Sequence, residues 1–254
     1  MTQLTPYSPG RKAMIQMGNT KMEIEPPKRA GHAAEPIKSM DDIDLIINHM
    51  LATYRYRDCL MFVMGINFGL RYSDLSALRF GDIIDQNGRY FHPVRIQERK
   101  TSKQKICFMN PSTTEAFELY CGRHQINRND LIFPSPRDQT KPLTRQNMDD
   151  KFKRIINQEL GLPVHCSTHF LRKTYAYHFI MQSEDRSRAL EYLQLAFGHS
   201  SPIITLRYAG ITDDEIEKTV MKMNLGGVRY LDLNVKTICS FESNGQLIDV
   251  LQSA

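Results

Sequence analysis

An apolar run from Cys59 to Leu70, broken only by Asn67, is the feature that most constrains the fold of this sequence. A membrane-spanning helix needs about 20 apolar residues, so this run is too short to cross a bilayer. A helix over residues 57–68 would be apolar on nearly all sides, and such a helix has to be buried. Gly69 is its expected end. The run therefore predicts a buried helix, and no membrane partner is expected.

Size and composition fit a globular protein. The chain has 254 residues, of which 41% are hydrophobic and 24% charged; these values exclude a disordered or fibrous chain and favour one main domain with an appendage. The five cysteines are odd in number and lack CxxC or Cys/His ligand spacing. We therefore expect no disulfide framework, no zinc site and a reducing cytoplasmic location. The net charge of +5 permits a polyanionic partner without requiring one.

Further helices are predicted where apolar residues recur at spacings of three and four, after a capping Ser, Thr or Asn and before a Gly. Ser39 and Asn110 are two such caps, and Pro111 follows the second. These signals predict helices that begin after Ser39, near Leu75 and Leu78, and over residues 110–122, 144–161, 168–182, 186–197, 202–209 and 213–224.

Between residues 82 and 109 the apolar period changes to two, which indicates strands. The alternating runs lie near Ile83, over residues 90–96 and over residues 105–109, and turn-forming stretches at 87–88 and 100–103 separate them. We therefore predict a small three-stranded antiparallel sheet. The expected fold class is mainly α with this single β element.

The two ends of the chain differ from its centre. Residues 1–37 combine five of the twelve prolines with lysines and arginines and without apolar periodicity, and this predicts a flexible basic arm. Residues 38–225 hold the main domain. In the C-terminal tail, residues 226–254, the stretch 230–238 fits either a strand or a segment that docks elsewhere.

His169 and Arg172 are the first candidate site residues, three positions apart at the start of the predicted helix 168–182. This offset brings both side chains to one helix face, beside backbone amides that favour an anion. Taken alone the pair is weak evidence, because chance supplies such pairs in a chain of this composition.

His199 and Tyr208 are the next candidates, nine residues apart around the predicted helix 202–209. Ser201 and Pro202 make a good helix start, and His199 lies just outside it, where a phosphate would bind. A lone tyrosine here is more often a packing residue with a satisfied hydroxyl. The order of these residues after His169 and Arg172 is what favours a site.

Arg71 and the hairpin add positive charge. The planar guanidinium of Arg71 suits a phosphate, and Asp74 is placed to support it; the alternative is a local ion pair that caps a turn. Residues 95–105 hold five basic residues against one acidic residue, Glu98, so this hairpin is either a nucleic-acid contact or a solvated turn.

In their order along the chain, these motifs resemble the catalytic domain of the tyrosine recombinases, the phage integrase family. The motifs are Gly69-Leu70-Arg71 with Asp74, Lys100 on a hairpin, His169-Phe170-Leu171-Arg172, Leu195-Ala196-Phe197-Gly198-His199-Ser200-Ser201, and Tyr208. The resemblance covers about residues 40–225. Six functional positions in one order are far more specific than any one of them. The resemblance implies the DNA breaking-rejoining fold, with residues 38–225 as the catalytic domain.

The resemblance also implies the reaction, a DNA strand exchange through a 3′-phosphotyrosine with no metal or nucleotide cofactor. It implies these roles: Tyr208 as nucleophile, Arg71 and Arg172 on the non-bridging oxygens, His169 as proton relay, His199 as donor to a non-bridging oxygen, and Lys100 as acid for the 5′-oxygen. Lys103 and Lys105 compete with Lys100 for its role. The residues expected to contact DNA are Arg95, Arg99, Lys103, Lys105 and Lys173.

The implied partner is double-stranded DNA, bound by a homotetramer together with an accessory DNA-bending or arm-binding protein. The implied location is the cytoplasm, at the nucleoid. In this family a terminal segment often packs on a neighbouring protomer. Only about forty residues precede the first helix, where the family usually has a DNA-binding domain. We therefore expect weak, salt-dependent binding by an isolated monomer. The alternatives are a catalytically silent DNA-binding regulator or decoy, and a type IB topoisomerase.

Overall fold

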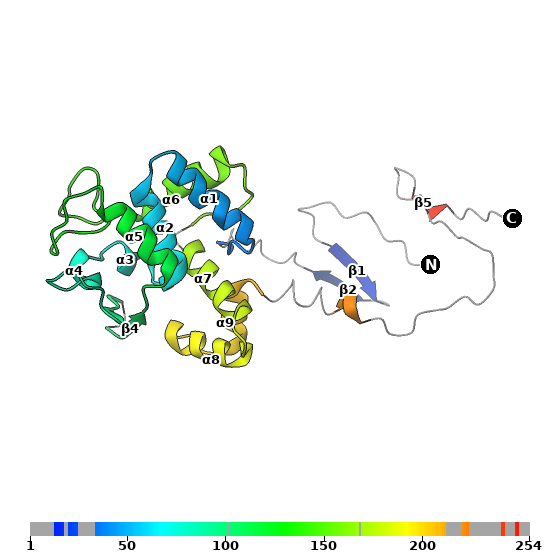
Figure 1. The fold of residues 1–254 in the computed structure, drawn as a ribbon. Helices are drawn as coiled ribbons and strands as arrows, with labels where there is room; N and C mark the ends of the chain where they lie inside the picture. The colour runs from blue at the N-terminus through cyan, green and yellow to red at the C-terminus, as the bar shows by residue number, and fades with distance from the viewer. Residues whose placement is uncertain are drawn as a thin grey trace, which may run out of the picture. The chain divides into compact units, whose positions relative to one another are not determined.

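The computed structural model describes residues 13–17, 20–24, 34–100, 102–167, 169–211, 220–223, 240–241 and 247–248. The chain divides into two units, Met1–Thr212 and Asp213–Ala254. The first unit is mainly helical (Figure 1). Within the described part of the chain, no helix is both long enough and apolar enough to cross a membrane.

The helices of the first unit follow the sequence pattern closely. They are α1 (Met40–Ala52), α2 (Tyr56–Phe68), α3 (Tyr72–Leu75), α4 (Phe80–Ile83), α5 (Pro111–Cys121), α6 (Arg145–Phe152), the π-helical η1 (Lys153–Glu159), α7 (Phe170–Met181), α8 (Arg186–Phe197) and α9 (Pro202–Ala209). The helices predicted over residues 186–197 and 202–209 are confirmed to the residue. The single helix predicted over 144–161 is α6 followed by η1, and Thr168 lies outside the described residues.

Capping residues fix several of these boundaries. The Ser39 hydroxyl accepts a hydrogen bond from the Asp42 amide at the start of α1, and Asn110 does the same for Thr113 at the start of α5. At the end of α2, Gly69 has φ +56°, a left-handed conformation that favours glycine.

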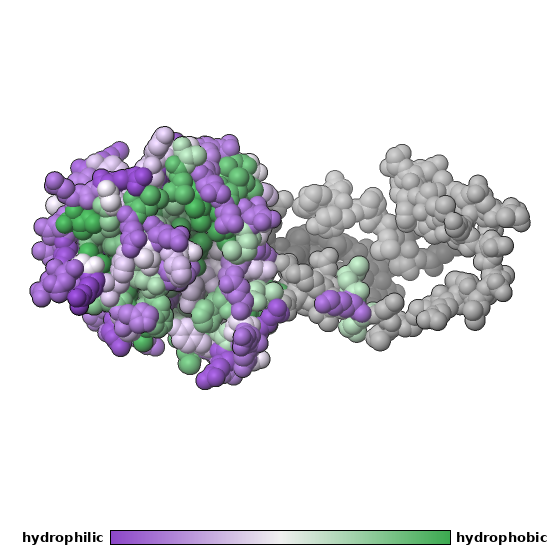
Figure 2. All heavy atoms as spheres, viewed as in Figure 1, coloured by the Kyte–Doolittle hydropathy of each residue, from purple (hydrophilic) through white to green (hydrophobic). Residues whose placement is uncertain are grey.

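Helix α2 is buried as predicted and forms the centre of the larger core. It packs against α1, α5 and α7. Gly65 makes the contact with α7 close: a Cβ added there would lie 2.6 Å from Leu171 Cδ1. A smaller core joins α7, α8 and α9, and its buried residues are Ala176, Ile180, Leu193, Phe197, Ala209 and Ile211. Outside these cores, hydrophilic side chains cover much of the face in Figure 2.

The sheet is smaller than predicted. Strands β3 (Val94–Gln97) and β4 (Gln104–Cys107) pair antiparallel, with Val94 opposite Cys107. The strand predicted near Ile83 is wrong, because Ile83 ends helix α4 and only an isolated bridge joins Ile84 to Tyr90. The Asp82 side chain accepts a hydrogen bond from the Arg79 amide and stabilises the helical turn there.

The terminal segments hold strands that the sequence pattern did not predict. Strands β1 (Ala13–Met17) and β2 (Thr20–Ile24) form an antiparallel hairpin within the segment expected to be a flexible basic arm. The signal was the alternation of Lys21 and Glu23 with apolar neighbours.

In the second unit, β5 (Ser240–Phe241) pairs with β6 (Leu247–Ile248). Of the helix predicted over 213–224, only residues 220–222 are described as helical, and the stretch 230–238 lies outside the described residues.

Candidate active site

Arg71 and Arg172, which lie far apart in the sequence, meet at one carboxylate. Arg71 precedes α3, where the chain leaves the buried helix α2, and Arg172 lies in the first turn of α7. Arg71 Nη1 is 2.6 Å from Glu98 Oε2, and Arg172 Nη1 is 3.9 Å from Glu98 Oε1. The side chains of Glu98 and Arg172 are only 4% and 5% exposed. Two guanidinium groups therefore point at one buried position that already holds an anionic group.

The carbonyl of Gly69 orients two cations of this site. It accepts hydrogen bonds from Arg172 Nη1 at 2.9 Å and from Lys105 Nζ at 2.6 Å. A glycine is required there for two reasons, the positive φ and the ring of Tyr175, which would lie 2.1 Å from an added Cβ. The Gly-Leu-Arg sequence thus supplies both a guanidinium group and a backbone acceptor.

Lys105 is the hairpin lysine that lies buried in this site. Its Nζ is 5.3 Å from the ring centroid of Tyr175 and 5.4 Å from that of Phe197. Burial, and after it the positive charge of Arg172, lower its pKa to about 8, while the negative charge of Glu98 partly opposes this shift. Strand alternation turns Lys105 to the buried face of β4, so it faces the arginines and not the solvent; its expected contact with DNA stays a prediction.

Tyr208 lies in the same site, in the last turn of α9. Its ring centroid is 5.3 Å from that of His199 and 5.5 Å from that of Phe197. The hydroxyl oxygen is buried and lacks a well-formed hydrogen bond within the part of the chain that the structure describes. Burial raises the pKa of Tyr208, whereas the charges of Arg172 and Arg71 lower it. The phenol is therefore protonated at neutral pH but close to two cations.

The two candidate histidines flank these groups. His199 Nδ1 lies 3.0 Å from Thr205 Oγ1, and burial followed by the charges of Arg172 and Arg71 lowers its pKa. His169 caps α7 and is exposed on one side; partial burial and nearby cations, Arg145 foremost, lower its pKa. Both imidazoles are therefore largely neutral near pH 7 and able to accept a proton.

The remaining predicted residues divide between the hairpin surface and the site. Arg95, Arg99, Lys100 and Lys103 are exposed on the hairpin. Lys173 is half-buried, with its Nζ 5.3 Å from the ring centroid of Tyr208. Lys100 lies in the turn that begins at Glu98, outside the buried cluster.

Asp74 supports the hairpin. Its carboxylate is buried and accepts a hydrogen bond from the Arg99 amide at 3.0 Å. The sequence predicted that Asp74 supports Arg71, but Glu98 is the carboxylate paired with Arg71. Sequence reasoning missed the role of Glu98, although the buried positions Val94, Ile96 and Glu98 follow one alternating pattern.

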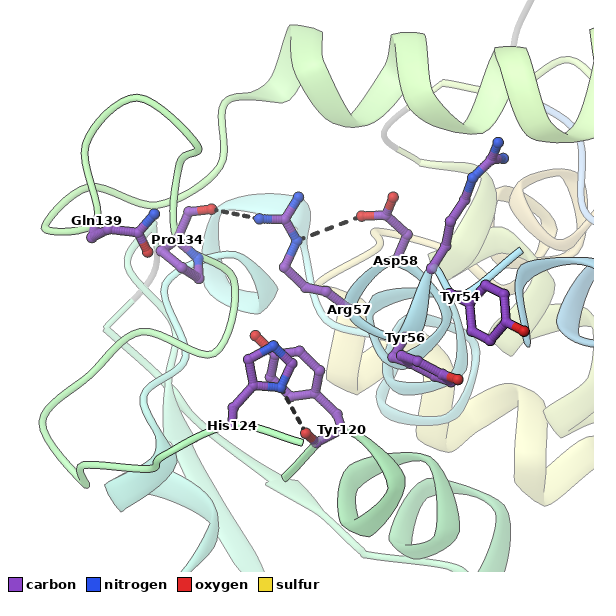
Figure 3. Close-up of a pocket in the computed structure, with 9 residues that line it drawn as sticks. Tyr54, Tyr56, Arg57, Asp58, Tyr120, His124, Pro134 and Gln139 are labelled. Carbon is purple, nitrogen blue, oxygen red and sulfur yellow. Dashed lines mark hydrogen bonds and ion pairs between the residues drawn. The ribbon is translucent and has the colours of Figure 1, made fainter. Parts of the chain in front are cut away.

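A separate cavity of about 500 Å³ lies at the other end of α2, lined by Tyr54, Tyr56, Tyr120 and His124 among others (Figure 3). The 13 residues of α2 put about 20 Å between this end and Arg71. Arg57 in this cavity donates to the Pro134 carbonyl and pairs with Asp58. The cavity thus lies apart from the arginine pair. Among the described residues, no group of three or more His, Cys, Asp or Glu side chains is arranged to hold a metal ion.

Comparison with known proteins identifies relatives for most of this chain. A model of the phage integrase family matches residues 39–215. The probable integrase/recombinase YoeC of Bacillus subtilis strain 168 is 31% identical over 183 residues, which are 72% of this chain and 93% of YoeC. Tyrosine recombinase XerC of Oceanobacillus iheyensis is 25% identical over 215 residues, which are 81% of this chain and 66% of XerC.

Solved structures share the fold. XerA recombinase aligns with a TM-score of 0.56 at 18% identity, over 78% of this chain and 66% of its own. XerH recombinase, solved after cleavage with its palindromic difH substrate, aligns with a TM-score of 0.56 at 20% identity, over 77% of this chain and 55% of its own. This chain therefore spans less than two thirds of the length of either structure. The expected fold class, mainly α with a small antiparallel sheet, is confirmed.

Proposed function

Because this chain belongs to the phage integrase family, we propose that it is a site-specific recombinase that cuts and rejoins double-stranded DNA through a 3′-phosphotyrosine. The observation that carries the proposal is that Tyr208 lies in one buried site with Arg71 and Arg172. A nucleophile next to two guanidinium groups is the arrangement that transesterification at a phosphodiester requires.

The reaction would proceed by exchange of one ester for another. Tyr208 Oη forms a bond to phosphorus while the bond from phosphorus to the 5′-oxygen breaks. Arg71 and Arg172 hold the two non-bridging oxygens, whose negative charge grows toward the five-coordinate transition state. The free 5′-hydroxyl of another strand can then attack the phosphotyrosine, restore the diester and release the phenol. The bond energy is conserved, so no nucleotide cofactor is needed.

Two protons have to move in the cleavage step. The phenol proton leaves Tyr208, and His169 is the proposed acceptor or relay, while His199 donates a hydrogen bond to a non-bridging oxygen. The departing 5′-oxygen takes a proton from a hairpin lysine. We assign this role to Lys100, which is exposed at the turn and can follow the hairpin to the DNA. Lys105 is already hydrogen-bonded to Gly69 and supplies fixed positive charge instead.

DNA would contact the exposed side of the hairpin as well as the reacting site. Arg95, Arg99 and Lys103 are exposed there, and lysine and arginine contacts with phosphates make binding weaken as salt rises. The finer assignments follow the family resemblance: a homotetramer on DNA, an accessory DNA-bending or arm-binding protein, and action in the cytoplasm at the nucleoid. No metal is proposed, since the guanidinium groups and the lysines provide the positive charge.

A nicked suicide substrate tests the proposal. The full chain is incubated with a pool of nicked duplexes of random sequence, so that cleavage releases a short fragment and traps the covalent adduct, which is detected after denaturation. Wild type should form the adduct and Tyr208→Phe should form none. The matched control is Tyr192→Phe on α8, which removes an exposed tyrosine hydroxyl and should leave the adduct unchanged.

Other outcomes would redirect the assignment. Equal adduct in wild type and Tyr208→Phe excludes Tyr208 as the nucleophile. DNA binding with no adduct in any variant supports a silent DNA-binding regulator. An adduct accompanied by relaxation of supercoiled DNA without a preferred site supports a type IB topoisomerase.

A further inference from the structure

Glu98 occupies the position between the two arginines that an anion would take. Its carboxylate oxygens lie 2.6 Å from Arg71 Nη1 and 3.9 Å from Arg172 Nη1, and the side chain is 4% exposed. We propose that Glu98 is a positioning residue that holds the arginine pair in the DNA-free chain and is displaced when a phosphodiester binds. The inference rests on the proposed function for the identity of that anion.

The hairpin register explains why a carboxylate reaches this position. Val94, Ile96 and Glu98 are the buried residues of alternate positions along and just beyond β3. The Glu98 amide donates to the Lys103 carbonyl at 2.9 Å, and the Ser102 amide donates to the Glu98 carbonyl at 2.9 Å. These bonds close the turn and fix the backbone of Glu98, so its side chain continues the inward face of the strand.

Glu98 and a phosphate would compete for the same donors. Carboxylate and phosphate both accept charge-assisted hydrogen bonds from the fork of an arginine. Two anions held together in one buried site repel each other strongly, because burial reduces the screening by water. The carboxylate of Glu98 therefore has to leave before a phosphate can take both arginines. In the free chain, Glu98 supplies a counter-charge to the buried guanidinium group of Arg172 and to the partly buried one of Arg71.

Displacing Glu98 would also loosen the hairpin turn. The next residue, Arg99, donates its amide to Asp74, so the turn is anchored directly beside Glu98. When the Glu98 side chain leaves the arginines, the turn that carries Arg99 and Lys100 loses its ion pairs with Arg71 and Arg172 and is held less firmly. Binding of the phosphate is thereby coupled to release of the turn with the proposed acid, Lys100. The acid is free to approach the reacting group only when DNA is present.

A titration with inorganic phosphate tests the inference without DNA. The full chain, labelled with ¹⁵N-arginine, is titrated at constant ionic strength, and the arginine Nε–H signals report binding. Glu98→Gln keeps the shape of the side chain and removes its charge. It should bind phosphate roughly tenfold or more tightly than wild type, because removal of a unit negative charge about 4 Å from the bound anion removes a repulsion that water screens only weakly at a partly buried site. Glu98→Ala should show the same gain.

Controls separate a charge effect from a structural one. Glu98→Asp retains the negative charge and should bind phosphate as weakly as wild type. The gain in phosphate affinity of Glu98→Gln should disappear in the double variant that also carries Arg71→Ala. Equal affinity in wild type, Glu98→Gln and Glu98→Ala overturns the inference, and so does a gain that survives Arg71→Ala, because the phosphate then binds elsewhere.

The outcome is distinguishable from a failure of the proposed function. Phosphate binding does not depend on adduct formation. If the protein forms no DNA adduct but Glu98→Gln binds phosphate more tightly, the inference about Glu98 stands and the recombinase proposal fails. If the protein forms the Tyr208 adduct but Glu98→Gln shows no gain in phosphate affinity, the recombinase proposal stands and the inference about Glu98 fails.

Discussion

Lys105 Nζ donates a 2.6 Å hydrogen bond to the carbonyl oxygen of Gly69, and the same oxygen accepts a hydrogen bond from Arg172. A lysine of the hairpin and an arginine of α7 are thus both tied to the backbone at the end of α2. This linkage separates two roles for the hairpin lysines. Lys105 is held in the site by the fold, whereas Lys100 is exposed on the turn.

The first prediction distinguishes these lysines. In single-turnover cleavage of the nicked substrate, Lys100→Met should lose about 10²–10⁴-fold in rate, the range expected for a general acid. A substrate with sulfur in place of the 5′-bridging oxygen should restore this rate, because a thiolate leaves without a proton. Lys105→Met should also be slow, but the sulfur substrate should not rescue it. Rescue of Lys105→Met instead would move the acid role to Lys105.

The second prediction concerns the pH dependence of stability. Burial lowers the pKa of Lys105 to about 8 from its ordinary value of 10.5. Between these two values the unfolded chain binds the proton and the folded chain does not, so stability rises with pH in this window. The free energy of unfolding of wild type, relative to Lys105→Met, should rise by on the order of 1 kcal/mol per pH unit above pH 8.

Urea unfolding at pH 7, 8, 9 and 9.5 measures this difference. Other groups that titrate in this range are present in both proteins and cancel in the comparison. A difference between the two proteins that stays constant with pH would contradict a buried, depressed Lys105.

The third prediction concerns Gly69. An alanine there has to adopt φ +56° and to fit against the ring of Tyr175. Left-handed backbone and overpacking together should lower the free energy of unfolding of Gly69→Ala by about 2–5 kcal/mol. Gly161→Ala is the matched control, because Gly161 has φ +69° but open space around its Cβ. That variant should lose only about 1–2 kcal/mol. Equal losses in urea unfolding would exclude the contact with Tyr175.

Local signals predicted much of the helical fold. Helix α8 has the bounds that were predicted, and the structure shows what fixes them: Asp185 accepts a hydrogen bond from the Arg188 amide at its start, and Gly198, with φ +71°, ends it. The buried helix α2 was predicted because its apolar residues leave no polar face. Ile83 was assigned to a strand because the apolar segment around it is too short for its periodicity to distinguish a strand from a helix. In the structure, the hydrogen bond from the Arg79 amide to the Asp82 side chain stabilises a helical turn there.

The interior of the site was harder to predict. The hairpin register decides whether a lysine faces the arginines or the solvent, and a shift of one residue reverses the two faces. The turn depends on residues such as Ser102, with φ +54°, which no simple sequence pattern marks. The family resemblance favoured Lys100 over its competitor Lys105, but no local sequence pattern separated the two. Glu98 stood out in the sequence only as the one acidic residue of a basic stretch, because its partners, Arg71 and Arg172, lie far from it along the chain.

The close contact between Gly65 and Leu171 has a consequence for catalysis. It holds α2 against α7 with almost no free space. Arg71 comes three residues after the end of α2, and Arg172 lies in the first turn of α7. Both guanidinium groups are therefore attached to one rigid pair of helices, whose close spacing depends on the absence of a side chain at Gly65. Any motion in the proposed reaction then has to come from the elements that contact this pair of helices, the hairpin and helix α9, which carries the proposed nucleophile Tyr208.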